Sequence, residues 1–183
     1  SPALSVLVIT SYQTALVMAL LPCAAMGERF GYRRVFVRGV TLFVAASVAS
    51  SLAPSLPFLI AARFVQGLGA AAVMALGVAL MRTAVSDARL GEAISWNALT
   101  VALSAAAGPA IGALVLSFAP WPCLYVVNLP IGLGVLLASR ALGSNAPGKQ
   151  PLDIGSIALN CIAFGSLVTG AQNLLSAPAI AVS

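Results

Sequence analysis

Apolar residues in this chain come in blocks of about 20, and that block length limits the folds open to it. A helix rises about 1.5 Å per residue, so about 20 residues cross a hydrocarbon core about 30 Å thick. Charged residues make up 7% of the 183-residue chain, against about a quarter in typical soluble domains. Weak alternation and abundant Ala, Leu and Gly favour helices over the strands of a barrel. The sequence therefore predicts an all-α, polytopic membrane helical bundle.

We expect about six transmembrane helices, separated by stretches rich in proline, glycine or charge. The predicted spans are 4–25, 35–53, 57–81, 93–118, 121–139 and 154–175. Residues 1–142 would form most of a first bundle with five spans, 143–153 a cytoplasmic linker, and 154–183 a further transmembrane helix and a short tail. The chain begins with Ser, and no basic segment precedes its first apolar run. We expect it to be a fragment of a longer protein.

The basic residues lie in alternate interruptions between the predicted spans. Those flanking the first, third and fifth interruptions are Arg29, Arg33, Arg34, Arg38, Arg82, Arg89, Arg140 and Lys149. The second and fourth interruptions carry none. The positive-inside rule makes the basic interruptions cytoplasmic and predicts that the N-terminus lies outside a cell membrane that the chain crosses several times. This distribution explains the net charge of +5 without a nucleic-acid partner.

The residues that usually carry enzymatic or metal chemistry are scarce here. The chain has no histidine. Its three cysteines, Cys23, Cys123 and Cys161, are far apart in the sequence, and each lies among apolar residues. No clustered acids and no nucleophile–base pair are visible. The sequence therefore predicts a protein that is not an enzyme and that needs no metal or cofactor.

Between the first two spans stands "GERFGYRR", residues 27–34. Taken alone it is a tight turn that Gly27 and Gly31 permit, with a positive anchor for topology. The pattern also resembles the loop signature that joins the second and third spans in the major facilitator superfamily, although Glu28 and Ala24 stand where that family prefers Asp and Gly. The resemblance implies that these charges lock the cytoplasmic ends of two transporter halves together. The matching residues are Gly27, Glu28, Arg29, Gly31, Arg33 and Arg34.

An arginine interrupts the third apolar block, in "RFVQGLGAA" at residues 63–71. Arg63 and Gln66 are three positions apart and share a helix face. Arg63 could snorkel to the nearby interface or face an inward polar site, and Gln66 with the small residues beside it favours the second. The stretch resembles the fourth-span motif of the same superfamily, with Arg63, Gln66, Gly67 and Gly69 matching, which implies a role for Arg63 in proton coupling. Other candidates for the cavity are Tyr12, Gln13 and Asn97.

The fourth apolar block contains "SAAAGPAIGA", residues 104–113. Ser104, Gly108 and Gly112 recur every four residues and form a small-residue stripe, which is also compatible with ordinary helix packing. Pro109 removes one backbone hydrogen bond. The stretch resembles, in part, the fifth-span motif of major facilitator antiporters, which implies a hinge or seal in the transport pathway.

Two further stretches, "WPCLYVVNLPIGL" (121–133) and "LDIGSIAL" (152–159), resemble the sixth and seventh spans of the fourteen-span drug:proton antiporters. Without the family, Trp121 is an interfacial anchor and Asp153 a helix N-cap. The resemblance covers about spans two to seven and implies multidrug efflux by alternating access. It implies as partners a small-molecule substrate, protons, the lipid bilayer and the remaining half of the transporter.

Coupling to protons needs a titratable carboxylate near the cavity, and this chain has none in the middle of a span. Its acids are Glu28, Asp87, Glu92 and Asp153, all in predicted loops or at a boundary. We expect the carboxylate to come from another part of the transporter, so that the isolated chain would not perform coupled transport. The alternative function is a truncated remnant or scaffolding half that does not transport.

Overall fold

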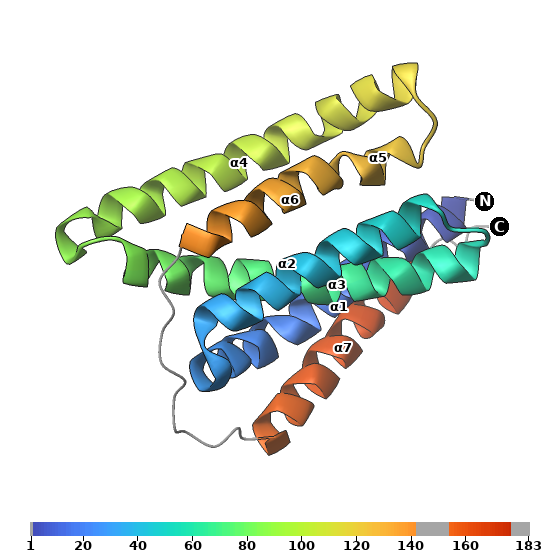
Figure 1. The fold of residues 1–183 in the computed structure, drawn as a ribbon. Coiled ribbons are helices and arrows are strands. Elements are labelled where there is room, and N and C mark those ends of the chain that lie inside the picture. Colours follow the sequence, from blue (N-terminus) through green and yellow to red (C-terminus); the bar gives the residue numbers. More distant parts are fainter. Residues whose placement is uncertain (1, 142–153, 177–183) are drawn as a thin grey trace.

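The structure, a computed structural model, describes residues 2–141 and 154–176, which form helices and turns without a strand (Figure 1). The long helices, in chain order, are α1 (Pro2–Phe30), α2 (Tyr32–Ser51), α3 (Leu56–Ala84), α4 (Asp87–Phe118) and α7 (Ile154–Ser176). Between α4 and α7 lie the shorter elements α5 (Cys123–Val126), α6 (Asn128–Ala138) and the 3₁₀ turn η1 (Ser139–Ala141).

Five segments are long and apolar enough to cross a membrane: Val6–Phe30, Tyr32–Ser51, Leu56–Ala84, Asp87–Phe118 and Cys123–Ala141. The prediction of an all-α chain with membrane-length helices is therefore confirmed. The sixth predicted span is helical as α7, and its apolar stretch among the described residues is the shorter Ile157–Val168. The predicted linker 143–153 lies outside the described residues, so the division into domains stays a prediction.

The first interruption is much shorter than predicted. Instead of residues 26–34, Gly31 alone separates α1 from α2. Its φ of 95° lies in the left-handed region that glycine adopts without steric cost. Gly27, which the sequence suggested as a second turn glycine, lies inside α1. A Cβ there would overlap the side chain of Leu76 on α3, so Gly27 is a packing glycine instead.

The third interruption is also shorter than predicted. Residues 81–93 were predicted to be a loop, yet α3 continues to Ala84 and α4 begins at Asp87. Charged residues can stay in a helix at its ends, where they match the helix dipole. Arg82 lies in the last turn of α3 and Asp87 in the first turn of α4, which is the favourable polarity for both.

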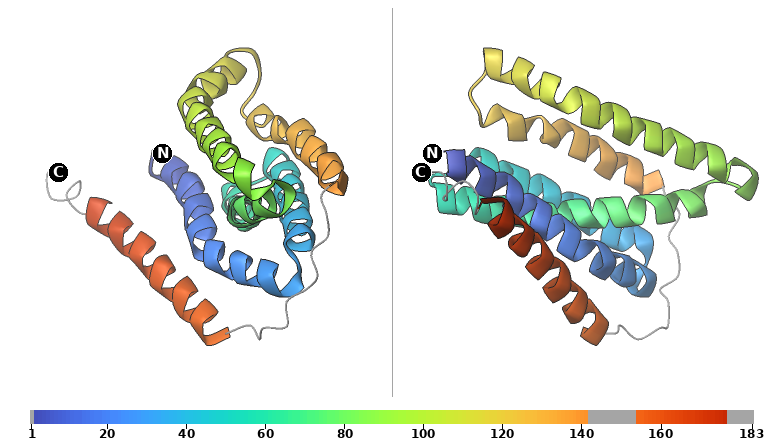
Figure 2. Two further views of the ribbon diagram at one scale, coloured as in Figure 1. Left: turned by 90° about the vertical axis from the view of Figure 1, so that its left-hand side faces the viewer. Right: turned by 180° about the vertical axis from the view of Figure 1, so that it is seen from behind.

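Helix α3 is the centre of the fold, with α1 and α2 packed along it. Figure 2 shows α7 on the outer side of α1, and α4 paired with α5 and α6 at the opposite edge. The buried apolar cluster lies between α2 and α3 and consists of Val35, Phe36, Val40, Leu76 and Leu80. Side chains of α6 pack against this cluster, whereas no residue of α4 is buried.

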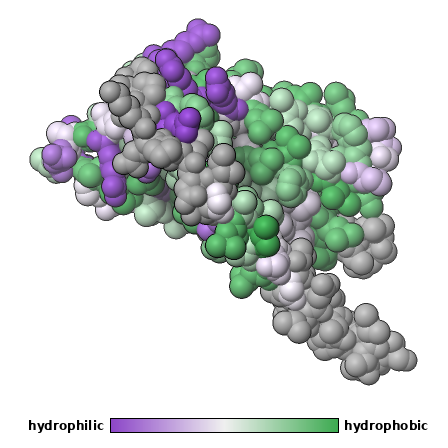
Figure 3. Space-filling model, turned by 90° about the horizontal axis from the view of Figure 1, so that it is seen from below, coloured by the Kyte–Doolittle hydropathy of each residue, from purple (hydrophilic) through white to green (hydrophobic). Residues whose placement is uncertain are grey.

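The α1–α2 turn, the α3–α4 turn and the end of α6 lie at one end of the bundle (Figure 1). Figure 3 shows strongly hydrophilic side chains gathered toward that same end, with hydrophobic side chains over the middle of the visible face. The described parts of the basic interruptions predicted to share one side of a membrane therefore share one end of the structure.

Candidate functional site

Arg63 lies near the start of α3, and its side chain is directed at other side chains of the protein. Its Nη1 donates a hydrogen bond to Oε1 of Gln66 at 2.6 Å. The two residues are three positions apart in one helix, so their pairing confirms the shared face that the spacing predicted. A charge-assisted bond of this kind holds the guanidinium in one orientation.

Gln66 carries the polar contact from α3 to α2. Its side chain is fully buried, at 0% exposure. Its Nε2 donates to Oγ of Ser47 at 2.6 Å, and that hydroxyl donates in turn to the carbonyl oxygen of Phe43 at 2.8 Å. A buried amide is stable only when its donors and acceptors are paired, and this chain of bonds supplies partners for both ends of Gln66.

Two tyrosine rings flank the Arg63 guanidinium. Its central carbon lies 4.3 Å from the ring centroid of Tyr12 on α1 and 5.6 Å from that of Tyr125 on α5. A cation above an aromatic ring is stabilised by the ring's quadrupole. These contacts, with Gln66, favour the inward-facing interpretation of Arg63 over snorkelling. Helices α1, α3 and α5 thus meet at one cation, and α2 joins them through the bond between Ser47 and Gln66.

One donor of this cation is buried without a partner in the described part of the chain. Among the described residues, Arg63 Nε is buried and has no hydrogen-bond partner. An unpaired charged donor in a buried position costs more than a neutral one.

Two glycines of α3 let its neighbours come close enough to build this site. A Cβ on Gly67 would overlap the backbone oxygen of Tyr12, and it would lie 2.9 Å from Cβ of Ala15. A Cβ on Gly69 would lie 2.7 Å from the backbone nitrogen of Phe43. Close approach of helix backbones at small residues is the usual packing mode in membranes. Gly67 serves the α1 contact, and Gly69 serves the α2 contact.

The other predicted cavity residues differ in their placement. Tyr12 belongs to the site, whereas Gln13 next to it is exposed and is not among the described contacts of Arg63. Asn97 is partly exposed on α4. Sequence reasoning missed Ser47 and Tyr125, each a polar residue within a predicted span. The one sequence signal that could have indicated them is a polar residue within an apolar span.

The charged turn makes its own contact to another part of the bundle. Arg33 on α2 donates from Nε to the carbonyl oxygen of Ser139 at 2.9 Å and from Nη2 to that of Arg140 at 3.3 Å. These carbonyls close the C-terminal end of α6 and η1, where unpaired oxygens and the helix dipole favour a cation. Arg33 therefore ties the first turn to the end of the fifth span.

The remaining charges of this turn point elsewhere. Glu28, Arg29 and Arg34 are exposed, and the Arg29 guanidinium lies 5.5 Å from the ring centroid of Phe30. Glu28 lines a cavity of about 440 Å³ between α1 and α3, together with Arg82. The predicted lock to a second transporter half needs residues outside the described ranges, so it stays a prediction.

The two glycines of the α4 motif face open space among the described residues. The helix runs through Pro109 without a break. A Cβ added to Gly108 or Gly112 would meet no atom within 4 Å. The small-residue stripe is thus present as a surface, and its predicted role as a hinge or seal is not tested by this arrangement.

Comparison with known proteins gives one family. Residues 1–180 match the Major Facilitator Superfamily. The uncharacterized transporter YebQ of Escherichia coli is 40% identical over 172 residues, which are 92% of this chain and 38% of that protein. The drug efflux pump JefA of Mycobacterium tuberculosis is 39% identical over 148 residues, 80% of this chain and 29% of JefA.

A third relative is the tetracenomycin C resistance and export protein of Streptomyces glaucescens, which is 32% identical over 171 residues. That match covers 92% of this chain and 31% of the relative. The chain thus spans less than two fifths of the length of each of these relatives.

Proposed function

The chain belongs to the major facilitator superfamily, and from this premise we propose that it forms part of a secondary transporter that exports drugs or other small amphipathic molecules. Relatives named as a drug efflux pump and as a resistance and export protein support this direction and cargo. We further propose that protons drive the export. The partners would be the substrate, protons, the bilayer and the rest of the transporter.

The contacts of Arg63 carry the proposal. A cation inside an apolar span costs about 2.5–3.5 kcal/mol at the bilayer centre on insertion scales, and such residues usually mark transport pathways. Here the cation is held by Gln66 and by the rings of Tyr12 and Tyr125. Packing alone would not require this arrangement, because an apolar residue could fill the same space at lower cost.

In this mechanism Arg63 acts through its permanent charge. Alternating access moves one bundle against the other around a central site. A carboxylate from another part of the transporter would pair with the Arg63 guanidinium when ionised. Protonation of that carboxylate would weaken the pair, and the loss of attraction would bias the bundle toward its other state.

The charged turn would set the sidedness of this cycle. We propose that residues 27–34 face the cytoplasm, that the N-terminus of the chain lies outside, and that the host is the cell membrane. The gathering of the basic turns at one end supports this orientation. Arg33 would keep α2 and the end of α6 moving as one body during the transition.

The test is efflux by the full-length protein in cells loaded with ethidium, a fluorescent amphipathic cation. Arg63→Ala should abolish efflux because both the charge and its fork of donors are lost. Arg63→Lys should leave only a small fraction of it, because an ammonium cannot reproduce the planar guanidinium contacts. Arg89→Ala, which removes an exposed charge from α4, is the matched control and should export normally.

Membrane insertion of each variant is measured in parallel by its amount in the membrane fraction and its helical circular dichroism. Wild-type efflux in a well-inserted Arg63→Ala protein would contradict the proposed role of Arg63 and favour snorkelling. Loss of insertion in that variant alone would instead make Arg63 a structural residue.

A further inference from the structure

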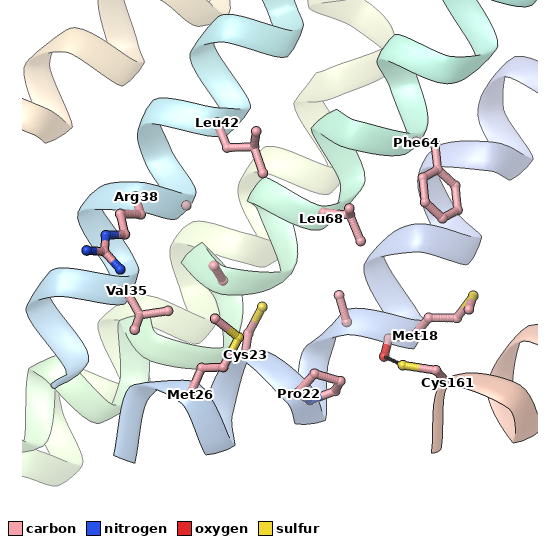
Figure 4. A pocket seen from close by; sticks show the side chains of 13 residues that line it. Met18, Pro22, Cys23, Met26, Val35, Arg38, Leu42, Phe64, Leu68 and Cys161 are labelled. Atoms are coloured by element: carbon pink, nitrogen blue, oxygen red, sulfur yellow. Dashed lines mark hydrogen bonds between the residues drawn. The ribbon is translucent and has the colours of Figure 1, made fainter. Parts of the chain in front are cut away.

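A groove of about 370 Å³ lies between α1, α2 and α3, with Cys161 of α7 at its edge, apart from the Arg63 site (Figure 4). Except for Arg38, the side chains that line it are apolar or contain sulfur. Met18, Pro22 and Met26 form its wall on α1, and Phe64 and Leu68 form its wall on α3. Its size lies within the range of small-molecule pockets, about 300–1,000 Å³.

One cation joins this groove to a second depression. Arg38 on α2 lines the groove and also lines a basic depression of about 510 Å³ together with Arg33, Arg34 and Val37. In Figure 4 the Arg38 side chain leaves α2 at the edge of the groove and points away from its apolar walls. The apolar groove thus adjoins a cluster of guanidinium groups at the charged end of the bundle.

The arginines of this cluster differ in their hydrogen bonding. Among the described residues, its hydrogen bonds both come from Arg33, whose donors reach the carbonyls at the end of α6 and η1. Arg34 and Arg38 are exposed, which leaves their guanidinium groups available. A guanidinium fork matches the geometry of a phosphate, and basic pockets at the cytoplasmic side of membrane helices bind anionic head groups.

We propose that this paired groove and depression bind one anionic diacyl phospholipid, with its phosphate on Arg34 and Arg38 and an acyl chain along the groove. Inside a bilayer the acyl chain exchanges one apolar contact for another, so it gains little free energy from burial. The head-group charge therefore provides most of the selectivity, and the groove fixes where the lipid sits. The proposal depends on the cytoplasmic orientation of this end and does not depend on transport.

The experiment uses the full-length protein in nanodiscs of phosphatidylglycerol and phosphatidylcholine with identical acyl chains, followed by native mass spectrometry in mild detergent. Wild-type protein should retain phosphatidylglycerol in preference to phosphatidylcholine. Each basic side chain near an anionic surface contributes about a factor of five. The double variant Arg34→Gln with Arg38→Gln should therefore retain about 25-fold less of it.

Two controls separate the site from general charge and shape. Arg89→Gln removes an exposed arginine of α4, outside the depression, and should retain the lipid as the wild type does. Leu42→Trp fills the groove without changing charge and should lower retention, whereas Leu52→Trp, at a 74% exposed position outside the groove, should not. Helical circular dichroism verifies that every variant is folded.

Three outcomes would overturn the proposal. Equal retention of the two lipids by the wild type would mean that the head group is not recognised. Undiminished retention in the double variant would mean that Arg34 and Arg38 do not hold it. Displacement of the lipid by an equal concentration of free glycerol phosphate would mean that the depression binds a phosphate without using the groove.

Discussion

Helices α3 and α4 follow one another in the chain and are both rich in small residues, yet they behave differently in the fold. On α3, Gly67 and Gly69 are each met by the backbone of a neighbouring helix. On α4, Gly108 and Gly112 meet nothing within 4 Å, and no residue of that helix is buried. The same pattern of small residues therefore forms a packed helix–helix interface (a seam) on α3 and an open surface on α4.

The difference shows what a small-residue stripe requires. A stripe allows close approach, but a seam also needs a partner whose surface is already in position. Helix α3 is packed against both α1 and α2. Hydrogen bonds from Arg63 to Gln66 and from Gln66 to Ser47 also link α3 to α2. Helix α4 has only limited contact with α3 and α5 among the described elements. We therefore expect changes on α3 to be costly and the same changes on α4 to be tolerated.

The largest effect should come from Gly69→Leu. Its Cβ alone would lie 2.7 Å from the backbone nitrogen of Phe43 and 2.8 Å from the backbone oxygen of Gly39, and backbone atoms cannot turn aside. We expect the free energy of unfolding to fall by at least about 3 kcal/mol. The measurement is denaturant unfolding in detergent micelles, followed by helical circular dichroism.

The matched control for this change is Gly77→Leu on the same helix, where an added Cβ meets no atom within 4 Å. It should unfold like the wild type or slightly later, because leucine favours helix more than glycine does. If the two variants unfold alike, the close approach of α2 and α3 at Gly69 is wrong.

A smaller loss should follow from Gln66→Leu. Leucine has a similar volume, so packing is nearly kept, but Arg63 Nη1 and the Ser47 hydroxyl each lose a partner. Unsatisfied buried groups cost about 1–3 kcal/mol, and we expect a loss of about 2 kcal/mol in the same unfolding assay. Gln13→Leu changes an exposed amide and should have almost no effect. An equal loss in both variants would remove the distinction between the two glutamines.

Next comes Arg33→Gln, which removes the two bonds to the carbonyls of Ser139 and Arg140. These bonds are partly exposed, so we expect a loss of only about 1 kcal/mol. The more direct measurement is hydrogen exchange at the end of α6, which should become faster as that end frays. Arg29→Gln, an exposed arginine near the same turn, should leave that exchange unchanged. Unchanged exchange in Arg33→Gln would mean that Arg33 does not secure α6.

Much of the helical architecture was predictable from sequence, because helices depend on local patterns. The apolar block length predicted the helices, and the three-residue spacing predicted that Arg63 and Gln66 share a helix face. Helix ends were predicted less well, since charge was taken as a sign of a loop. Arg82 and Asp87 stay helical because each lies at the helix end that its charge favours.

The parts of the site that come from other helices could not be predicted. Ser47 reaches the Arg63 network through the packing of α2 against α3, and Tyr125 reaches it through the packing of α5 against α2. No local spacing encodes either contact. For the same reason Gly27 was predicted to be a turn residue, although its role is set by Leu76 on another helix. Periodicity predicts a face, and tertiary packing decides what meets that face.

The smallest effect is expected for the double variant Gly108→Ala with Gly112→Ala. Nothing among the described residues meets the added methyl groups, so the free energy of unfolding should stay within about 0.5 kcal/mol of the wild type. The same denaturant series in micelles measures it. A loss as large as that of Gly69→Leu would mean that α4 is packed against a surface that the described helices do not provide. The stripe on α4 would then be a finished seam like that of α3, and the contrast between the two helices would disappear.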